Sequence, residues 1–395
     1  MNIVLLTALY PLPSIQKFEK QNTKADHYYA LEWQKSGHRV IVLNIAAEYV
    51  LRKGCFIRSE RYEFEGVSVC YIRCPRFIPH SQRVFQGTAK RVERMAKQYI
   101  AESGMDHVDL FYCDFATSNM EVISLLKSER LFQNSRFIPV FNHCDFIDLK
   151  RAKTIAEDAP VIGARAESQK KWILAIDPSA NVVITLSGTP EINDERVGQK
   201  VSMGARPKRF MLAANLIPRK NADILLQSFA KVHQVHHDTE LTIVGDGPER
   251  ERLTALAESL DLSGCVKFTG AVSRQRVVEF MIESDVFVMV SHDETFGIVY
   301  VEALGAGCYV IAALGEGIDG VIQDSVNGSL VEARNVDALA DKILWYFERS
   351  DEERRKLLSS AYQTAQMYTE EKVAEKALRD IDIAFRGIEQ FGHGK

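Results

Sequence analysis

Short apolar runs recur along the whole chain, and stretches with helical periodicity separate them. Each run is four to seven residues long, rich in Val, Ile, Leu or Phe, and mostly continuous rather than alternating. The runs form two series: 3–7, 39–44, 67–72, 110–113, 137–141 and 182–186, then 210–214, 240–244, 266–269, 286–290 and 309–312. Continuous apolar strands that take turns with helices are typical of parallel sheets covered by helices on both faces.

Two α/β domains follow from the break between these series. The 395 residues exceed one ordinary core of roughly 150 residues. The stretch between the series has no apolar period, and we place a linker there, at 191–209. We expect Rossmann-like domains at 1–190 and 210–365, and charged helices at 366–395 that pack back on the first domain. Because open parallel sheets bind ligands beyond the carboxyl ends of their strands, the working site should lie in a cleft between the domains.

Composition and charge exclude several classes of protein. The chain has 46% hydrophobic residues, 26% charged residues and 11 prolines, which describes a globular rather than a disordered chain. A net charge of −4 argues against a nucleic-acid partner. The seven cysteines include no Cys-x-x-Cys pair, so we expect reduced thiols and no zinc site. Because no apolar run reaches about 18 residues and no basic leader precedes the first run, we expect a cytoplasmic protein.

One segment departs from the near-neutral balance of the chain. Residues 51–100 hold eleven Lys or Arg against four Glu, a local charge of +7. Within this segment Val92, Ala96 and Tyr99 share one face of an expected helix, and basic residues occupy the other faces. Two interpretations remain open. The helix is either a core helix with a solvated basic side, or a surface that docks on an acceptor or on the anionic inner face of a membrane.

The strongest candidate for chemistry follows the apolar run 286–290. Glu294 lies at the expected turn from this strand to a helix that begins near Phe296. The first amides of that helix, those of Phe296, Gly297 and Ile298, would bind an anion. Gly297 has no Cβ, so a bulky anion could approach the backbone closely. The segment therefore predicts an anion site at a helix N-terminus.

Glu302 lies eight positions after Glu294, about two turns into the same helix. A glutamate among Val and Ala inside a helix is costly unless its carboxylate has a partner. The two vicinal hydroxyls of a ribose would satisfy both oxygens. Glu302 thus predicts a ribose-binding position close to the anion site at the start of the helix.

These residues resemble the GT-B-fold retaining glycosyltransferases akin to glycogen synthases and mannosyltransferases, the group 1, family 4 type. The E-x7-E pair Glu294 and Glu302 encloses Phe296-Gly297, as in that family. Further family motifs follow in the family's order at 216–221 (LIPRKN), 243–248 (IVGDGP), 266–270 (VKFTG), 284–288 (SDVFV) and 326–328 (VNG). The resemblance is specific over residues 209–350. It implies a GT-B fold, in which two Rossmann-like domains face each other across a cleft. By the same resemblance, 1–190 would be the acceptor domain and 210–365 the nucleotide-sugar donor domain.

The resemblance implies a nucleotide diphosphate sugar as the donor substrate. Lys220 and Arg219 would neutralise the leaving diphosphate together with the amides of residues 296–298. Glu294 would bind sugar hydroxyls, and Glu302 would bind the ribose.

Three other positions are assigned by the same resemblance. Gly245, in the IVGDGP motif, would belong to the donor site, and the backbone around Val272 would hold the base. His143 follows the run 137–141 and is similar to the active-site histidine of the family. It would donate to the sugar or to the reacting phosphate from the first domain.

The chain also departs from the family pattern. Asn215 stands where the family has an arginine, which leaves Lys220 as the main cation for the diphosphate. Residues 14–21 replace the family's Gly-Gly loop with longer, charged side chains. The single Asp-x-Asp sequence, Asp380 and Asp382, lies in the tail helix rather than after a strand, so we expect no metal.

The sequence therefore predicts a retaining, metal-independent hexosyltransferase with a saccharide or lipid-linked acceptor, active in surface-polysaccharide or lipopolysaccharide assembly. A UDP-sugar is favoured over GDP-mannose by its frequency in the family alone. The alternative is a catalytically silent sugar-binding or partner protein of GT-B fold, motivated by Asn215 and the missing Gly-Gly loop. A dinucleotide oxidoreductase is disfavoured because Arg250 stands where the third glycine of its fingerprint would lie.

Overall fold

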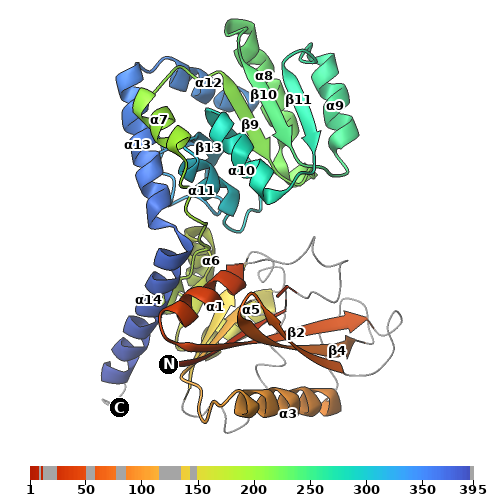
Figure 1. Cartoon of the computed structure of the whole chain (residues 1–395), viewed down its shortest axis with the longest axis vertical. Coiled ribbons are helices and arrows are strands. Elements are labelled where there is room, and N and C mark those ends of the chain that lie inside the picture. Colours follow the sequence, from red (N-terminus) through yellow and green to blue (C-terminus); the bar gives the residue numbers. More distant parts are fainter. Residues whose placement is uncertain are drawn as a thin grey trace. The chain divides into compact units, whose positions relative to one another are not determined.

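The chain folds into two compact units, shown in the computed structural model of Figure 1. The first unit comprises residues 1–188 and 370–395, and the second comprises residues 189–369. The structure describes residues 1–8, 10–11, 25–49, 58–76, 86–114, 135–142 and 149–391. Each unit has its own largely parallel sheet with helices packed on it, so the two α/β domains expected from the apolar runs are present.

The first unit contains an eight-stranded sheet in the order β3-β4-β2-β1-β5-β6-β7-β8. Its strands are β1 (Asn2–Thr7), β2 (Arg39–Tyr49), β3 (Arg58–Phe64), β4 (Val67–Arg76), β5 (Leu110–Asp114), β6 (Arg136–Phe141), β7 (Ile162–Ala164) and β8 (Val182–Ile184). All neighbours run parallel except β3 and β4, which form an antiparallel edge. The strands proceed from β1 to one edge and from β5 to the other, so the topological switch point lies between β1 and β5.

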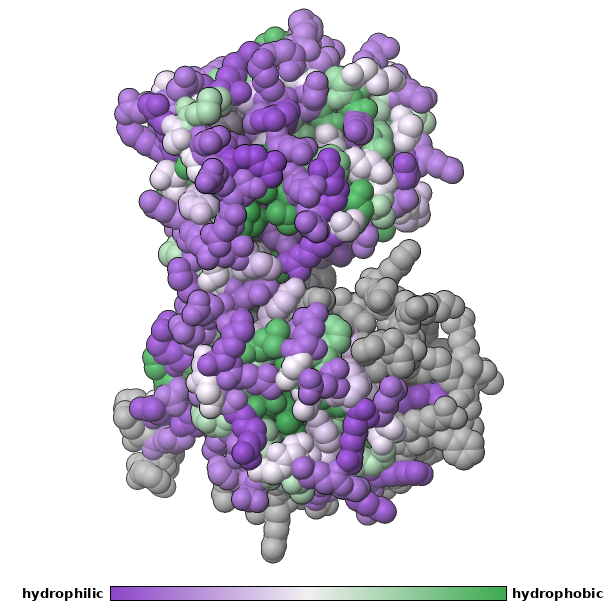
Figure 2. All heavy atoms as spheres, in the orientation of Figure 1, coloured by the Kyte–Doolittle hydropathy of each residue, from purple (hydrophilic) through white to green (hydrophobic). Residues whose placement is uncertain are grey.

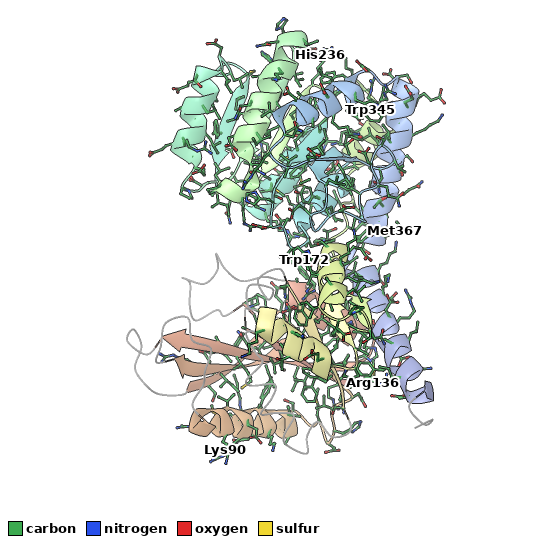
Figure 3. All side chains as sticks on the ribbon, turned by 180° about the vertical axis from the view of Figure 1, so that it is seen from behind. Lys90, Arg136, Trp172, His236, Trp345 and Met367 are labelled. Carbon is green, nitrogen blue, oxygen red and sulfur yellow. The ribbon has the colours of Figure 1, made fainter. Side chains whose placement is uncertain are left out.

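The helices of the first unit include one from the far end of the chain. They are α1 (Ala25–Lys35), α3 (Gln86–Glu102), α5 (Leu149–Asp158), α6 (Glu167–Ile176) and α14 (Glu370–Phe391). The indole of Trp33 donates a hydrogen bond to the Ala374 carbonyl at 3.0 Å, which ties α1 to α14. Arg136, labelled in Figure 3, pairs with Asp382 of α14 at 2.6 Å. The C-terminal helix therefore belongs to the first unit.

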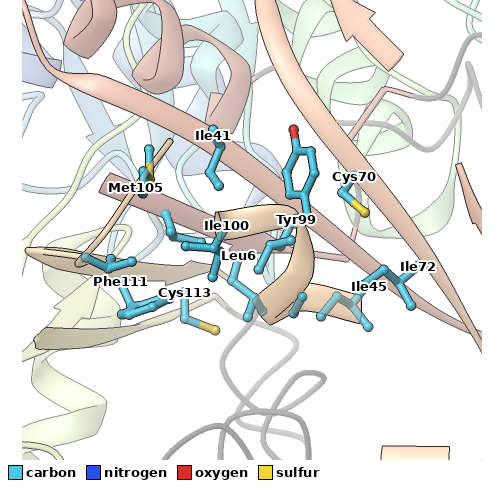
Figure 4. Close-up of a cluster of buried hydrophobic side chains, with 14 of the residues drawn as sticks. Leu6, Ile41, Ile45, Cys70, Ile72, Tyr99, Ile100, Met105, Phe111 and Cys113 are labelled. Atoms are coloured by element: carbon cyan, nitrogen blue, oxygen red, sulfur yellow. The ribbon is translucent and has the colours of Figure 1, made fainter. Parts of the chain in front are cut away.

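The main core of the first unit lies between the sheet and α3. Tyr99 and Ile100 of this helix pack with Leu6, Ile41 and Cys70 from three strands (Figure 4). The apolar face of α3 is thus buried in this core, and its basic residues lie on the other faces. This is the core helix with a basic outer side that was the first interpretation of the segment.

The second unit contains a six-stranded parallel sheet in the order β11-β10-β9-β12-β13-β14. Its strands are β9 (Arg209–Ala213), β10 (Glu240–Val244), β11 (Val266–Gly270), β12 (Val286–Met289), β13 (Tyr309–Ala313) and β14 (Ser329–Val331). The strands proceed from β9 to one edge and from β12 to the other. The switch point of this sheet therefore lies between β9 and β12.

The structure differs from the linker expected at 191–209. This stretch contains α7 (Glu195–Met203), which packs on α13 within the second unit. Asp194 caps the N-terminus by accepting from the Arg196 amide, and Gly204 ends the helix in the left-handed region. The absence of an apolar period concealed a short amphipathic helix between two sequence-encoded caps.

The other helices of the second unit cover its sheet. They are the 3-10 turn η4 (Pro218–Lys220) and the helices α8 (Ala222–Val235), α9 (Arg250–Ser259), α10 (Arg274–Glu283), α11 (Ile298–Gly305), α12 (Val336–Phe347) and α13 (Asp351–Met367). The face shown in Figure 2 is mostly hydrophilic over both units. None of the helices that the structure describes combines the length and apolar character needed to span a membrane.

Candidate functional site

Two loops meet at the switch point of the second unit, beyond the carboxyl ends of β9 and β12. The His292 amide donates to the Arg219 carbonyl at 2.9 Å. The side chain of Asn221, which begins α8 in the left-handed conformation, donates to the Val290 carbonyl at 2.6 Å. These bonds hold the loop that carries Lys220 against the loop that carries Glu294.

The Lys220 ammonium and the Glu294 carboxylate form an ion pair at this junction. Both side chains are 11% exposed. The Ser291 hydroxyl donates to the same carboxylate oxygen at 3.3 Å, and the Arg219 guanidinium lies 3.9 Å from it. Arg219 also donates to the Asp293 carbonyl at 3.0 Å. The candidate cations and the candidate carboxylate thus lie together and partly neutralise each other.

The turn between β12 and α11 has a special backbone. Gly297 has a φ of 74°, and a Cβ there would lie 2.4 Å from the Tyr300 ring. Only glycine therefore fits this position without strain. The helix begins at Ile298, two residues later than the sequence predicted, so Phe296 belongs to the turn and its side chain is buried. The amides of Gly297 and Ile298 lie at the helix N-terminus, where an anion is favoured.

Glu302 lies in the interior of α11 and is buried. Its carboxylate accepts from the guanidinium of Arg274, the first residue of α10, at 2.5 Å. Burial raises the pKa of Glu302, and the neighbouring Arg274 opposes this shift. Arg274 is 45% exposed, so the buried carboxylate is paired with a side chain that reaches solvent.

The remaining donor-site candidates lie at the same edge of the sheet. Gly245 follows β10 and donates from its amide to the Gly270 carbonyl at 3.0 Å. A Cβ on Gly245 would lie 1.9 Å from the Ala214 carbonyl oxygen, so the loops after β9 and β10 are in backbone contact. Val272 lies between the end of β11 and α10. The structure therefore brings all nine candidates of the second unit to the carboxyl ends of one sheet.

Sequence reasoning missed two residues of this site. One is Arg274, the partner of Glu302. The other is Glu316, in the loop after β13, whose carboxylate accepts from the Glu294 amide at 2.9 Å. The same loop approaches closely enough that a Cβ on Gly317 would lie 2.3 Å from the Thr295 carbonyl oxygen. The need for a partner of Glu302 was visible in the sequence, but its identity depends on the packing of α10 against α11.

The carboxylates of the Asp-x-Asp sequence are engaged elsewhere. Asp380 pairs with Lys376 and Asp382 pairs with Arg136, all in the first unit. Within the described part of the chain, no group of three or more His, Cys, Asp or Glu side chains could hold a metal ion.

Comparison with known proteins identifies the family of the region that carries these side chains. Residues 195–364 match the family model of the glycosyl transferases group 1. Over this region the chain is similar to the group 1 glycosyltransferases. The matched range includes every residue of the second unit named above as part of the site.

Two relatives, one bacterial and one archaeal, illustrate the similarity. The chain is 30% identical over 155 residues to a GDP-mannose-dependent alpha-(1-6)-phosphatidylinositol monomannoside mannosyltransferase of Mycolicibacterium smegmatis. That match spans 38% of this chain and 40% of the relative. A longer match, 27% identical over 343 residues, covers 79% of this chain and 83% of an uncharacterized glycosyltransferase of Methanocaldococcus jannaschii.

Solved structures extend the likeness to the whole chain. Sucrose-phosphate synthase from Thermosynechococcus elongatus superposes with a TM-score of 0.71, at 16% identity, over 98% of this chain and all of that one. HepE of Anabaena, in complex with UDP, gives 0.69 at 16% identity over 97% of this chain. At this identity the likeness concerns the fold, and it confirms the GT-B architecture predicted from the sequence.

The corresponding edge of the first unit carries a different group of charges. His143, the candidate there, lies outside the described residues. Its neighbour Asn142 donates to the Asp114 carboxylate at 2.8 Å. The buried Arg165 guanidinium lies 2.6 Å from the Asp26 carboxylate and 2.9 Å from that of Asp114. Burial, with the neighbouring Asp114, raises the pKa of Asp26, although Arg165 opposes the shift.

Proposed function

We propose that the chain is a glycosyltransferase that moves a hexosyl unit from a nucleotide diphosphate sugar to a saccharide or glycolipid acceptor. The observation that carries the proposal is the Lys220–Glu294 pair at a switch point, beside a helix that begins after a glycine. A diphosphate needs cations and amide donors, whereas a sugar needs carboxylates that accept from its hydroxyls. This site offers both groups in contact with each other.

The ion pair has a direct consequence for donor binding. A diphosphate carries more charge than one carboxylate, so it draws the Lys220 ammonium away from Glu294. Glu294 is then available to accept from hydroxyls of the sugar. Arg219 and the amides at the start of α11 add further positive potential at the leaving group. The diphosphate thus prepares the carboxylate that binds the sugar, which couples recognition of the two halves of the donor.

The nucleoside end of the donor falls at Glu302. Ribose hydroxyls donate to the buried carboxylate and share it with Arg274, whose exposed side chain can move outward. Because protein cations and amides neutralise the diphosphate, transfer proceeds without a divalent metal. Retention of the anomeric configuration is proposed from the resemblance to retaining glycosyltransferases. Both properties are part of this proposal.

The supporting observations disagree on which nucleotide sugar is the donor. A UDP-sugar was favoured by its frequency in the family, and HepE was solved with UDP. The mycobacterial relatives are named GDP-mannose-dependent. The two nucleotides differ in the base, which the backbone around Val272 would meet. We therefore place both donors, with ADP-glucose, in the first experiment.

The test follows nucleotide release from UDP-, GDP- and ADP-sugars, and NMR of the product reports its anomeric configuration. Lys220→Met and Glu294→Gln should each lower turnover by about 100-fold or more, since each removes a group that acts on the reacting donor. Lys231→Met is the matched control, because Lys231 pairs with Asp337 on the exposed surface of the same unit. Addition of EDTA should leave the rate unchanged.

Three results would contradict the proposal or parts of it. No binding of any nucleotide sugar would overturn it. Binding without turnover would favour the silent sugar-binding alternative. Equal turnover in Lys220→Met, Glu294→Gln and the control would show that the assigned residues are wrong.

The basic face of α3 supports a second, separate proposal of docking on an anionic membrane. Lys90, Arg91 and Arg94 are exposed on this helix, and Figure 3 shows Lys90 pointing away from the unit. The apolar face of α3 is occupied by the core, so adsorption would be electrostatic, at about 1 kcal/mol per basic residue near the surface. Sedimentation with phosphatidylglycerol vesicles but not phosphatidylcholine vesicles is expected. Charge reversal of the three residues should abolish it, and unchanged sedimentation would refute docking.

A further inference from the structure

The first unit has a cavity of about 650 Å³ that the proposed transfer reaction does not use. It is lined by the first residues of β2, the ends of β3 and β4 near their shared turn, and the last turn of α3, with Gln34 and His38 at the margin. A volume of this size is within the range of small-molecule sites, about 300–1,000 Å³.

The cavity lies at the amino ends of the parallel strands, opposite the edge where the acceptor is expected. Arg39, which lines it, is the first residue of β2 and pairs with Asn2, the first residue of β1 in the ladder. The carboxyl end of that ladder, at Thr7 and Asn44, is five residues further along, or about 16 Å. A ligand here would therefore occupy a site of its own.

The charges of the cavity wall balance each other. Arg39 and Arg61 line it together with Glu63 and Glu102, and burial lowers the pKa of His38, which favours its neutral form. Arg61 pairs with Glu102, and both side chains are about half exposed. Without excess positive charge, the wall is poorly suited to a phosphate or another small anion. Charged donors and acceptors side by side suit a neutral ligand with many hydroxyls.

The same wall contains an aromatic surface and a buried hydroxyl that makes no hydrogen bond. The Tyr99 side chain is 6% exposed, and in the described part of the chain its hydroxyl has no partner within hydrogen-bond distance. Burial raises the pKa of Tyr99, and the nearby Ser103 hydroxyl opposes this shift. Figure 4 shows this hydroxyl pointing away from the apolar side chains of the core. The Arg61 guanidinium lies over the ring, 5.7 Å from its centre. A buried polar atom without a partner is destabilising, so it is expected to gain one when a ligand enters.

We propose that this cavity is a saccharide-binding site, distinct from the donor site. The sugar hydroxyls draw the half-exposed Arg61 and Glu102 apart, form hydrogen bonds to both, and gain access to the Tyr99 hydroxyl. Ser68 and Ser103 supply further hydroxyls at the rim. The ligand is a free monosaccharide or one residue of a glycan chain, which share this chemistry.

The experiment measures saturation-transfer-difference NMR and titration calorimetry on the full-length protein without any nucleotide sugar. The probes are methyl α-D-mannopyranoside, methyl α-D-glucopyranoside, maltotriose and pyrophosphate. Tyr99→Phe removes only the unpartnered hydroxyl. Tyr112→Phe is the matched control, since Tyr112 in β5 also has a buried hydroxyl without a hydrogen bond in the described structure but does not line the cavity.

At least one saccharide should bind, and Tyr99→Phe should weaken that binding about five- to tenfold without lowering the melting temperature. Tyr112→Phe should bind like the wild type. Tighter binding of maltotriose than of the methyl glycosides would identify a glycan chain as the ligand.

The proposal is wrong if no saccharide binds, if only pyrophosphate binds, or if Tyr99→Phe binds a saccharide as well as the control does. The proposal does not rest on the transfer reaction. Because no donor is present, a negative result here leaves the proposed function untouched, and failure of the transfer assay leaves this site untouched.

Discussion

The two units each carry buried charges at the carboxyl ends of their strands, but they use them differently. In the second unit, Lys220 and Glu294 are each 11% exposed and form a pair at the margin of the site. In the first unit, Arg165 and its two carboxylate partners are only 2–3% exposed. Charges at the margin can exchange a protein partner for a ligand, whereas fully enclosed charges cannot do so without disrupting the fold. Exposure thus separates a candidate reactive pair from one that holds strand ends together.

Arg165→Met should break the enclosed cluster and have the largest effect. It leaves the Asp114 carboxylate and the Asp26 carboxyl group buried without their cation, which costs about 3–5 kcal/mol in the free energy of unfolding. Hydrogen exchange followed by mass spectrometry should locate the loss in the first unit. Lys220→Met is the comparison variant and should destabilise less, because Glu294 retains Ser291 and Arg219 as neighbours. Equal destabilisation would erase the distinction between the two edges.

Gly297→Ala should strain the turn that precedes α11. A φ of 74° and contact with the Tyr300 ring make a Cβ unfavourable, at about 1–3 kcal/mol, and the displaced helix N-terminus should also weaken donor binding. Thermal unfolding and donor titration measure the two effects. Gly198→Ala in α7, where a Cβ would meet nothing within 4 Å, is the control and should be neutral or slightly stabilising. A Gly297→Ala protein with unchanged stability and donor affinity would contradict the geometry.

Glu302→Gln should affect ligand binding more than folding. The carboxylate is buried and its pKa is raised, so removing its charge costs little in the free protein. Charge-assisted bonds to ribose hydroxyls are lost, which should weaken donor binding about tenfold, or 1.4 kcal/mol. Calorimetry with the nucleoside diphosphate alone measures this effect. If the variant were strongly destabilised and bound the nucleotide normally, Glu302 would have a structural role, like that of the buried charges in the first unit.

Asp26→Asn should change how the free energy of unfolding depends on pH, more than its value at any one pH. The pKa of Asp26 is raised in the folded state. Folded Asp26 therefore retains a proton that it releases above about pH 4 in the unfolded state. Stability from this group is complete below that pH and is lost as pH rises toward the raised pKa, at no more than about 1.4 kcal/mol per pH unit. Asparagine should flatten this decline. Denaturant titrations of the wild type and variant between pH 5 and 9 measure it, and parallel profiles would refute the raised pKa of Asp26.

The apolar runs predicted the fold well where strands are buried on both faces. The strands missed by the sequence are those that lack such a run. The edge strand β3 is mostly polar because only β4 pairs with it, and β7 and β14 have three residues each. The helix α7 was also missed, although Asp194 and Gly204 mark its ends in the sequence. Cap residues would have corrected the predicted linker.

The same distinction applies to the candidate site: residues in short continuous motifs could be predicted, and their partners far away in the sequence could not. The strand-to-helix turn and the lysine loop could be predicted because each is a short, continuous motif. The partners Arg274 and Glu316 lie 28 and 22 positions from the residues that they contact. Arg165 and Asp26 are 139 positions apart. Such pairs form only when strands and helices pack, so a single sequence does not reveal them.

The two ends of the second unit lie side by side. The Thr189 amide donates to the Tyr368 carbonyl at 3.0 Å, and Thr189 also forms a parallel bridge with Thr369. In genetic terms the unit is an insertion, bounded by two junctions that are far apart in the gene and adjacent in space. Insertions with adjacent ends tolerate replacement and permutation. Exchange of residues 189–369 for the equivalent segment of a relative is therefore a route to chimeras that test whether this unit alone sets the nucleotide preference.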